Sequence, residues 1–287
     1  TAILEESRSR HVSPAFVAKA AVYARNAGAM KDMPALLASY LTVADPDLAV
    51  RVFGRVIDNG RMLRNFVQIM RSGQIGRRSL GSRPKRLVRE WLEKASMPQL
   101  MAAATGNDPS LADIVRMVHP APASAERRAF YGWLIGKPYD VAALPTEIAA
   151  FECWKRDPKG PLPPVPFEWL TAFPLTAKQW VELAGRMGWQ ALRMNLNTLA
   201  RNGAFDVKGA TQMVAERLSD ADTIARVRPA PYQLMVALDQ VGDAVPLRVK
   251  AALEEALELS LATVPVLKGH VVVCPDVSGS MSSAATG

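Results

Sequence analysis

The strongest constraint in this sequence is a nearly unbroken series of short apolar runs with helical spacing. Ser or Asp before Pro opens several runs, as at Ser13-Pro14, Asp45-Pro46 and Asp108-Pro109. Their side chains can accept hydrogen bonds from the free amides of a helix start, and Pro fits the first turn. Asn202-Gly203 closes another run with residues that tolerate left-handed geometry. The pattern predicts about fourteen helices joined by short turns, and hence a helical-repeat stack without a strict period.

Positive charge is concentrated in one part of the chain. Residues 51–94 contain twelve Lys and Arg and three Asp and Glu, whereas the rest of the chain has 23 basic and 24 acidic residues. The net charge of +8 therefore originates in this stretch. An anionic polymer favours such clustering, because several phosphates bound together release their counterions together. Basic patches also serve acidic proteins and membranes, and a solvated helix face is the simplest alternative.

Composition excludes several classes of protein. Hydrophobic residues make up 49% of the 287 residues, which is too many for a disordered chain. Two cysteines and three histidines, far apart in the sequence, cannot form a disulfide framework or a spaced zinc site. No apolar run approaches the roughly 20 residues that span a bilayer, and the acidic first residues are not a signal peptide. We therefore expect a soluble, cytoplasmic protein that does not act at a membrane.

The last segment departs from the helical pattern. Residues 269–274 are rich in Val and read as a buried parallel strand. Asp276, Ser278 and Ser280 follow in a loop, and their oxygens suit a hard divalent cation such as Mg²⁺. An ordinary Ser/Gly turn is the alternative. The sequence ends before the further strand–helix units of a doubly wound domain, so we expect this domain and its metal site to be incomplete in the chain.

Several blocks, in this order, resemble the Ro autoantigen family, whose RNA-binding part is the TROVE module. No single block is decisive, but together they extend over nearly the whole chain. They comprise residues 13–25, 30–37, 85–91, 113–122, 189–196, 225–232 and 276–281.

The resemblance implies a fold and a function. The implied fold is an all-α ring of HEAT-like repeats over residues 1–266, followed at residues 267–287 by the first strand and metal loop of a von Willebrand factor A-like domain. The implied function is non-enzymatic binding of small structured Y-like RNA on a basic outer face. Single-stranded 3′ ends of misfolded RNA would enter a central hole, and an exoribonuclease such as polynucleotide phosphorylase would be a partner in RNA quality control.

The candidate RNA-binding residues follow from the charge cluster and from the resemblance. His119 matches the family's His-Pro block at the RNA surface, although it could instead pack against Pro120. Arg193 matches an Arg-Asn pair, in which Asn195 could simply bind nearby backbone. The six tryptophans are expected in the core rather than as platforms for bases. The cations of the Gly/Ser loop and of the helix after it are Arg77, Arg78, Arg83, Lys85, Arg86 and Arg89.

Two alternatives of other classes remain open at this point. One is a HEAT-like protein-interaction scaffold whose A-like domain binds a protein ligand through the cation. The other is an RNA-processing enzyme, although no Ser–His–Asp or paired-carboxylate signature stands out.

Overall fold

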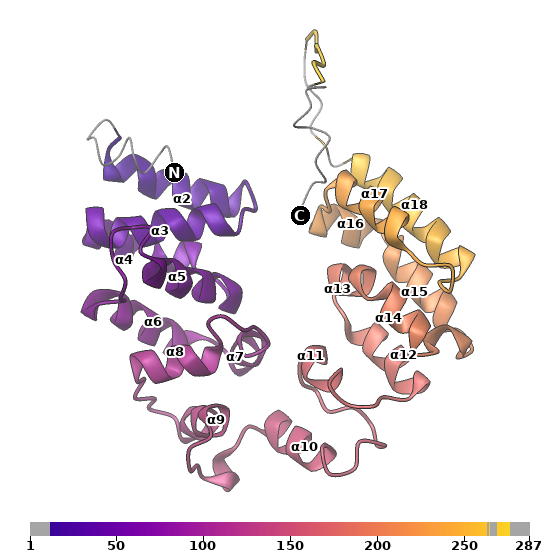
Figure 1. The fold of residues 1–287 in the computed structure, drawn as a ribbon, viewed down its shortest axis with the longest axis horizontal. Coiled ribbons are helices and arrows are strands. Elements are labelled where there is room, and N and C mark those ends of the chain that lie inside the picture. The colour runs from indigo at the N-terminus through magenta and orange to yellow at the C-terminus, as the bar shows by residue number, and fades with distance from the viewer. Residues whose placement is uncertain (1–11, 263, 265–268, 276–287) are drawn as a thin grey trace. The chain divides into compact units, whose positions relative to one another are not determined.

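The computed structural model describes residues 12–262, 264 and 269–275, and all regular structure in these residues is helical. The chain divides into two compact units, Thr1–Leu175 and Thr176–Gly287 (Figure 1). The helices of the first unit are α2 (Pro14–Asn26), α3 (Asp32–Ala44), α4 (Pro46–Val56), α5 (Gly60–Ser72), α6 (Ser82–Lys94), α7 (Met97–Ala103), α8 (Leu111–Val118), α9 (Ala125–Ile135), α10 (Thr146–Trp154) and α11 (Phe167–Leu170). Those of the second unit are α12 (Ala177–Arg186), α13 (Trp189–Met194), α14 (Leu196–Arg201), α15 (Ala210–Leu218), α16 (Ala221–Val227), α17 (Pro231–Gln240) and α18 (Leu247–Leu261).

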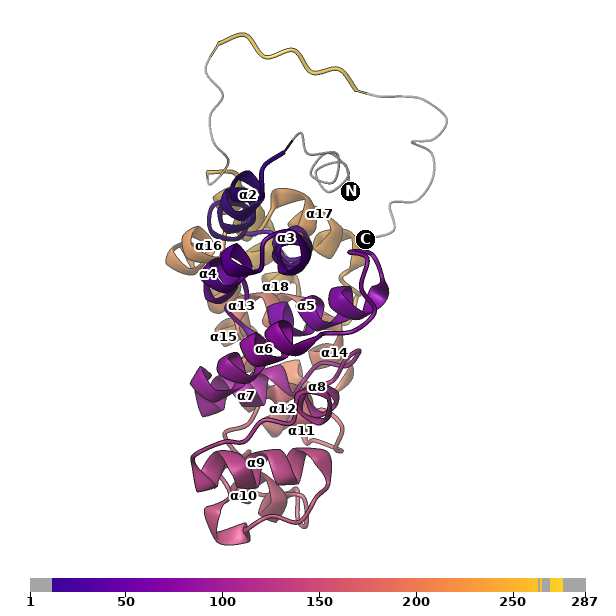
Figure 2. The same ribbon diagram turned by 90° about the vertical axis from the view of Figure 1, so that its left-hand side faces the viewer.

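The helices of the first unit stack in two layers (Figures 1 and 2). In one layer α2 packs on α4, α4 on α6 and α6 on α8; in the other α3 packs on α5 and α5 on α7. The layers meet through contacts such as those of α3 with α2 and α4. Leu63, Phe66 and Leu92 are fully buried in the core, and the rings of Phe53 and Phe66 meet edge to face with centroids 5.1 Å apart. The predicted helical-repeat stack is confirmed for the described residues.

Most helix starts follow the sequence signals, but Asp108-Pro109 does not open a helix, because α8 begins at Leu111 with Ser110 as its cap. Ser13 and Asp45 cap α2 and α4, and Pro occupies the first turn of each. A capping box forms at the start of α12, because Gln179 N donates to Thr176 Oγ1 and Thr176 N donates to Gln179 Oε1, at 3.3 and 2.9 Å. The run that Asn202-Gly203 closes forms two helices, α13 and α14, which are divided at Asn195. The amide of Asn195 donates to the Ala191 carbonyl at 2.8 Å, as one reading of the sequence anticipated.

Arginine side chains connect neighbouring helices through carbonyl groups at helix ends. The last carbonyls of a helix lack an intrahelical partner, and a charged donor forms a strong hydrogen bond with them. Arg64 of α5 donates to Ala103 O, the end of α7, at 2.6 Å. Arg127 of α9 donates to Leu92 O near the end of α6, at 2.5 Å. In the second unit Arg217 of α15 binds Ala184 O and Met187 O where α12 ends.

Two glycines make room for the contact between α5 and α7. A Cβ at Gly60 would overlap the backbone and side chain of Ala103, and a Cβ at Gly106 would overlap the guanidinium of Arg64. The guanidinium of Arg64 is partly buried by its bond to Ala103 O, and this burial, with a smaller contribution from the charge of Arg61, lowers the pKa of Arg64. Close approach of the two backbones thus depends on residues without a side chain.

Replacing Gly60 by Ala is expected to destabilise the protein by about 1–3 kcal/mol, because α5 and α7 must move apart. Gly54→Ala is the matched control, since Gly54 lies inside α4 with open space at its Cβ position. That change should stabilise the protein by about 0.5–1 kcal/mol through better helix propensity. Urea unfolding measures both free energies, and equal effects of the two substitutions would contradict the packing argument.

Tyr131 also secures the end of α6. Its hydroxyl donates to Leu92 O at 2.9 Å, the same carbonyl that Arg127 binds. Burial raises the pKa of Tyr131 to about 12. The folded protein therefore holds the phenolic proton more tightly than the unfolded chain, whose tyrosine titrates near 10.

The stability that Tyr131 contributes is expected to be complete below pH 10 and to be lost as pH rises toward about 12. Tyr131→Phe removes one buried hydrogen bond and should lower the free energy of unfolding by about 1 kcal/mol at pH 8. The difference between the two proteins should then narrow by pH 11.5. A difference that stays constant in urea unfolding across this range would refute the role of the phenolic proton.

The tryptophans lie in the core or against it, as predicted. Trp154, Trp180 and Trp189 are buried. Trp133 and Trp169 pack against each other with ring centroids 5.5 Å apart. They belong to an aromatic cluster that joins α9, α10 and α11.

The strand expected at residues 269–274 is not formed. Residues 269–275 have no regular structure and are exposed, with Val272 and Val273 each 82% accessible. A parallel strand needs neighbouring strands to satisfy its backbone groups, and the described residues contain none. The predicted metal ligands Asp276, Ser278 and Ser280 lie outside the described residues.

Candidate nucleic-acid interface

The predicted loop between α5 and α6 presents two of the candidate arginines. Gly73, Gly76 and Gly81 have positive φ angles and allow the chain to turn tightly from one helix to the next. Arg77 and Arg78 are exposed. Neither side chain has a hydrogen bond or an ion pair within the described part of the chain. Both are therefore available to an anion from solution.

Helix α6 carries four further candidate cations, Arg83, Lys85, Arg86 and Arg89. Arg83 lies 3.7 Å from Asp47, and Arg86 lies 3.7 Å from Glu90. All four side chains are well exposed, so these ion pairs contribute little and can exchange for phosphate. Lys85 is half-buried and has no side-chain partner among the described residues. The buried side of the helix consists of Pro84, Leu87, Val88 and Leu92.

The structure brings Arg89 and the end of α8 together. Arg89 Nε donates to Val118 O, the last carbonyl of α8, and His119 is the next residue. His119 is exposed and has left-handed geometry, with φ 49°. It is therefore not a buried core histidine. This hydrogen bond connects α6 to the end of α8 beside His119, and the part of Arg89 in RNA binding stays a prediction.

The turn at His119 has a counterpart in the second unit. His119-Pro120-Ala121-Pro122 follows α8, and Arg228-Pro229-Ala230-Pro231 follows α16. His119 has φ 49° and ψ 66°, and Arg228 has φ 48° and ψ 59°. Both side chains are exposed. Both segments have the sequence pattern Val-x-Pro-Ala-Pro, in which x is His119 or Arg228. Arg228 was nevertheless not among the predicted site residues.

Arg193 lies in the second unit and has a different environment. Its Nη1 donates to Gln233 O at 2.9 Å, whereas its buried Nε has no partner in the described part of the chain. Burial lowers the pKa of Arg193. It lines a hollow of about 280 Å³ between α13, α14 and α17, together with Asn197 and Gln240. Its bond to Gln233 connects α13 to α17, and its part in RNA binding stays a prediction.

Three cations that sequence reasoning did not group together also share a surface. Lys19 of α2 and Arg51 and Arg55 of α4 line one groove of about 810 Å³. Only the packing of α2 on α4 brings them together, because more than 30 residues separate Lys19 from Arg51 along the chain. The basic surface of the first unit therefore extends beyond α6.

The described part of the chain lacks two other kinds of site. No group of three or more His, Cys, Asp or Glu side chains in that part could hold a metal ion. None of its helices combines the length and the apolar character needed to cross a membrane.

The fold defines a class of protein: a stack of short paired helices of the helical-repeat type. The chain matches the crystal structure of the Ro (RSR) protein of Deinococcus radiodurans with a TM-score of 0.63 and 24% sequence identity. The match extends over 92% of this chain and 59% of that protein, so the chain spans about three fifths of its length. The expected likeness to Ro is thus confirmed at the level of the fold. No protein-family model and no protein of curated function matches the sequence.

The bond between Arg89 and Val118 O should contribute to the stability of the first unit. Arg89→Met keeps the aliphatic stem but leaves the carbonyl without its donor, so we expect a loss of about 1–3 kcal/mol in urea unfolding. Arg86→Met is the control, because Arg86 makes only an exposed ion pair, and its effect should stay within about 0.5 kcal/mol. The same small effect at Arg89 would show that the bond does not hold α8.

Proposed function

We propose that this chain is an RNA-binding protein of the Ro type. The proposed RNA-binding face consists of the loop before α6, the outer side of α6 and the end of α8. The observation that carries the proposal is the placement of cations without protein partners in the described chain, Arg77 and Arg78 in the loop before α6 and Lys85 on α6 itself. Arg89 connects this helix to Val118, the residue before His119. The Ro-like fold and the ordered sequence blocks support it.

The chemistry of this face suits the RNA backbone rather than particular bases. Guanidinium groups form bidentate contacts with phosphate, and ammonium groups add point charges. Double-stranded RNA is recognised mainly by its shape and its backbone. A small structured RNA is therefore a suitable ligand, and the affinity should fall steeply with salt.

The finer parts of the proposal rest on the resemblance to the Ro family. They are a Y-like RNA as the ligand, single-stranded 3′ ends of misfolded RNA held in the central hole of a closed ring, and a role in RNA quality control or degradation in the cytoplasm. An exoribonuclease such as polynucleotide phosphorylase is the proposed partner, and the chain itself is proposed to bind rather than to cleave RNA. A divalent cation such as Mg²⁺ at Asp276, Ser278 and Ser280 stays a prediction from the sequence.

Charge reversal on α6 tests the RNA-binding face. Arg83→Glu/Lys85→Glu/Arg86→Glu should weaken binding of a structured RNA hairpin at least 100-fold at 0.15 M salt. The slope of log affinity against log salt concentration should decrease by the amount expected for the loss of about three phosphate contacts. Lys137→Glu/Lys159→Glu/Lys178→Glu is the matched control, because it makes the same change in net charge at exposed lysines elsewhere. Equal losses in the two variants, measured by fluorescence anisotropy, would mean that only net charge matters. Unchanged affinity in the α6 variant would refute the proposed face.

A protein-interaction scaffold is the second candidate, and one observation favours it. Tyr232, Met235 and Val236 form an exposed apolar stripe on α17, with spacing that places them on one side of the helix. Salt-dependent RNA binding separates the two candidates, since a scaffold of this kind would bind RNA only incidentally.

A further inference from the structure

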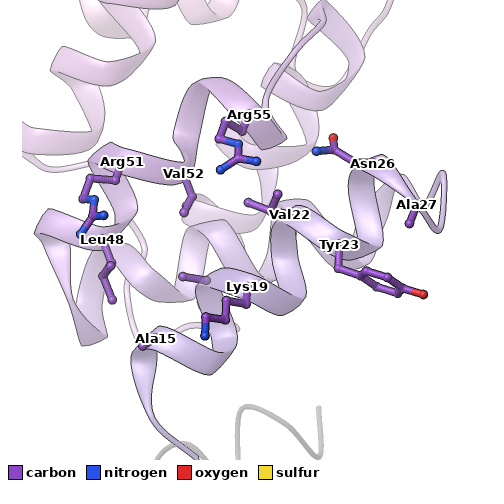
Figure 3. Close-up of a pocket in the computed structure, with 11 residues that line it drawn as sticks. Ala15, Lys19, Val22, Tyr23, Asn26, Ala27, Leu48, Arg51, Val52 and Arg55 are labelled. Atoms are coloured by element: carbon purple, nitrogen blue, oxygen red, sulfur yellow. The ribbon is translucent and has the colours of Figure 1, made fainter.

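The groove between α2 and α4 has the chemistry of a second ligand site. Eleven described residues line it, and none of them is acidic. Its apolar lining includes Val22, Leu48 and Val52 (Figure 3), and the buried Ala18 also contributes to it. Its volume of about 810 Å³ suits a small segment of a ligand rather than a single ion.

Three cations surround this apolar lining. Arg51 and Arg55 lie one turn apart on the same side of α4, and Lys19 faces the groove from α2. None of the three has a hydrogen bond or an ion pair through its side chain within the described residues. Positive charges that converge without counterions favour an anionic ligand.

Aromatic and amide groups lie along the α2 side of the groove. Tyr23 is 72% exposed, and its ring projects outward from the rim (Figure 3). Phe16 is 55% exposed and lies two turns earlier on the same edge of α2. Asn26 lines the groove with an amide that can both donate and accept hydrogen bonds. Exposed rings beside unpaired cations are typical of surfaces that stack the bases of single strands and bind their phosphates.

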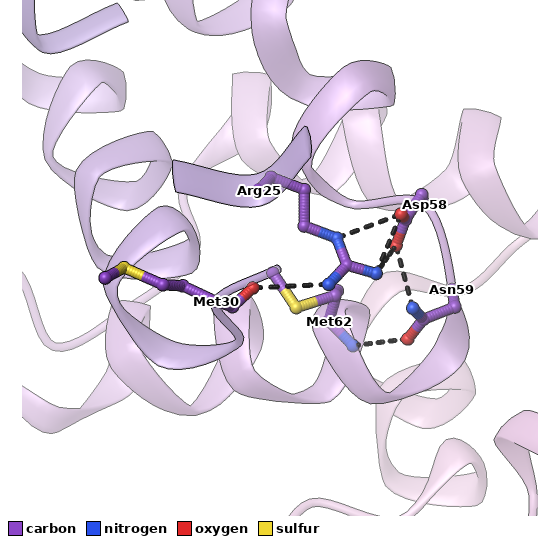
Figure 4. Close-up of polar contacts among 5 residues, drawn as sticks. All are labelled: Arg25, Met30, Asp58, Asn59 and Met62. Carbon is purple, nitrogen blue, oxygen red and sulfur yellow. Dashed lines mark hydrogen bonds and ion pairs between the residues drawn. The ribbon is translucent and has the colours of Figure 1, made fainter. Parts of the chain in front are cut away.

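The nearest carboxylate of the α4–α5 turn is already paired. Arg25 Nε and Nη2 donate to the two oxygens of Asp58 at 2.9 and 2.8 Å, and Asn59 Nδ2 donates to the same carboxylate at 2.8 Å (Figure 4). Arg25 also donates to Met30 O at 3.2 Å. These bonds hold the end of α2 against the start of α5 and neutralise Asp58. Arg25 is thus a positioning residue for the groove rather than a ligand of the anion.

The groove is continuous with the α6 side of the first unit. Arg51 and Arg55 also line a second hollow of about 500 Å³, which lies between α4 and α6 and includes Trp91 and Lys94. Asp58 and Glu90 also line this hollow, and they are paired with Arg25 and Arg86. An RNA bound on α6 could therefore continue across α4 toward α2 along Lys94, Arg51 and Arg55.

We propose that the α2–α4 groove binds an unpaired segment of the RNA whose double-helical part lies on α6. Lys19, Arg51 and Arg55 bind successive phosphates, and Tyr23 stacks on a base. This proposal rests on the proposed function, because it extends the same RNA from one surface to a second.

The test compares a blunt RNA hairpin with the same hairpin carrying a six-nucleotide single-stranded extension. Wild-type protein should bind the extended hairpin about tenfold more tightly, as expected for stacking of one base with added phosphate contacts. Tyr23→Ala should remove most of this gain and change the affinity for the blunt hairpin less than twofold. Tyr232→Ala is the matched control, since Tyr232 is an exposed tyrosine of the second unit.

The cations have their own comparison. Lys19→Gln/Arg51→Gln/Arg55→Gln should make the slope of log affinity against log salt concentration shallower by about 2 for the extended hairpin, because each contact with a single strand contributes roughly 0.7 to that slope. Lys137→Gln/Lys159→Gln/Lys178→Gln should leave the preference for the extended hairpin intact. A 4-thiouridine in the extension should crosslink to α2 in wild-type protein, as mapped by mass spectrometry.

The outcomes separate this proposal from the proposed function. If the extension adds no affinity while the α6 variant still loses the hairpin, the groove proposal is wrong and the RNA-binding face stands. If wild-type protein binds neither RNA, both are wrong. A further outcome is that polyglutamate with the same charge as the extension displaces the extended hairpin from the groove while Tyr23→Ala leaves the affinity for this hairpin unchanged. That result would identify a site for an acidic peptide and would also overturn the proposal.

Discussion

The two units depend on arginine side chains that bind carbonyl groups at the ends of neighbouring helices. Short helices leave many terminal carbonyls unpaired, and a stack of such helices must satisfy them where they meet the next layer. Arg64, Arg89 and Arg127 do so in the first unit, and Arg217 does so in the second. Each bond combines a charged donor with a helix end of negative partial charge, which favours it further. Packing of the apolar faces supplies most of the cohesion, and these bonds fix the positions of the helices.

Because of these bonds, not every cation of residues 51–94 is available to an anionic partner. The clustering of charge in residues 51–94 points to an anionic partner, yet Arg64 and Arg89 are committed to protein carbonyls. Of the other cations of this stretch, those of the loop and of α6 lie on the proposed RNA-binding face, whereas Arg51 and Arg55 line the groove of α2 and α4. The proposed RNA site is therefore a surface that the structural arginines position.

The parts of the site that sequence could predict are those formed by local structure. Arg77 and Arg78 lie in a glycine-rich loop and Arg86 on the outer side of a helix, as their positions in the sequence indicated. That Lys19 lines the same groove as Arg51 and Arg55 could not be predicted, because it depends on how α2 packs on α4. The expected strand at residues 269–274 shows the opposite case, since its Val-rich pattern favours a strand only when neighbouring strands are present.

The sequence by itself determined that this protein is a stack of short helices with one strongly basic stretch, because caps, helical periodicity and charge are local properties. Tertiary structure decided which of the basic side chains are free. Arg89 and Arg51 look alike in the sequence, but Arg89 reaches the last carbonyl of α8 whereas Arg51 faces an open groove. The cause is the distance of each guanidinium from a helix end elsewhere in the chain, and only the packing of the helices sets that distance.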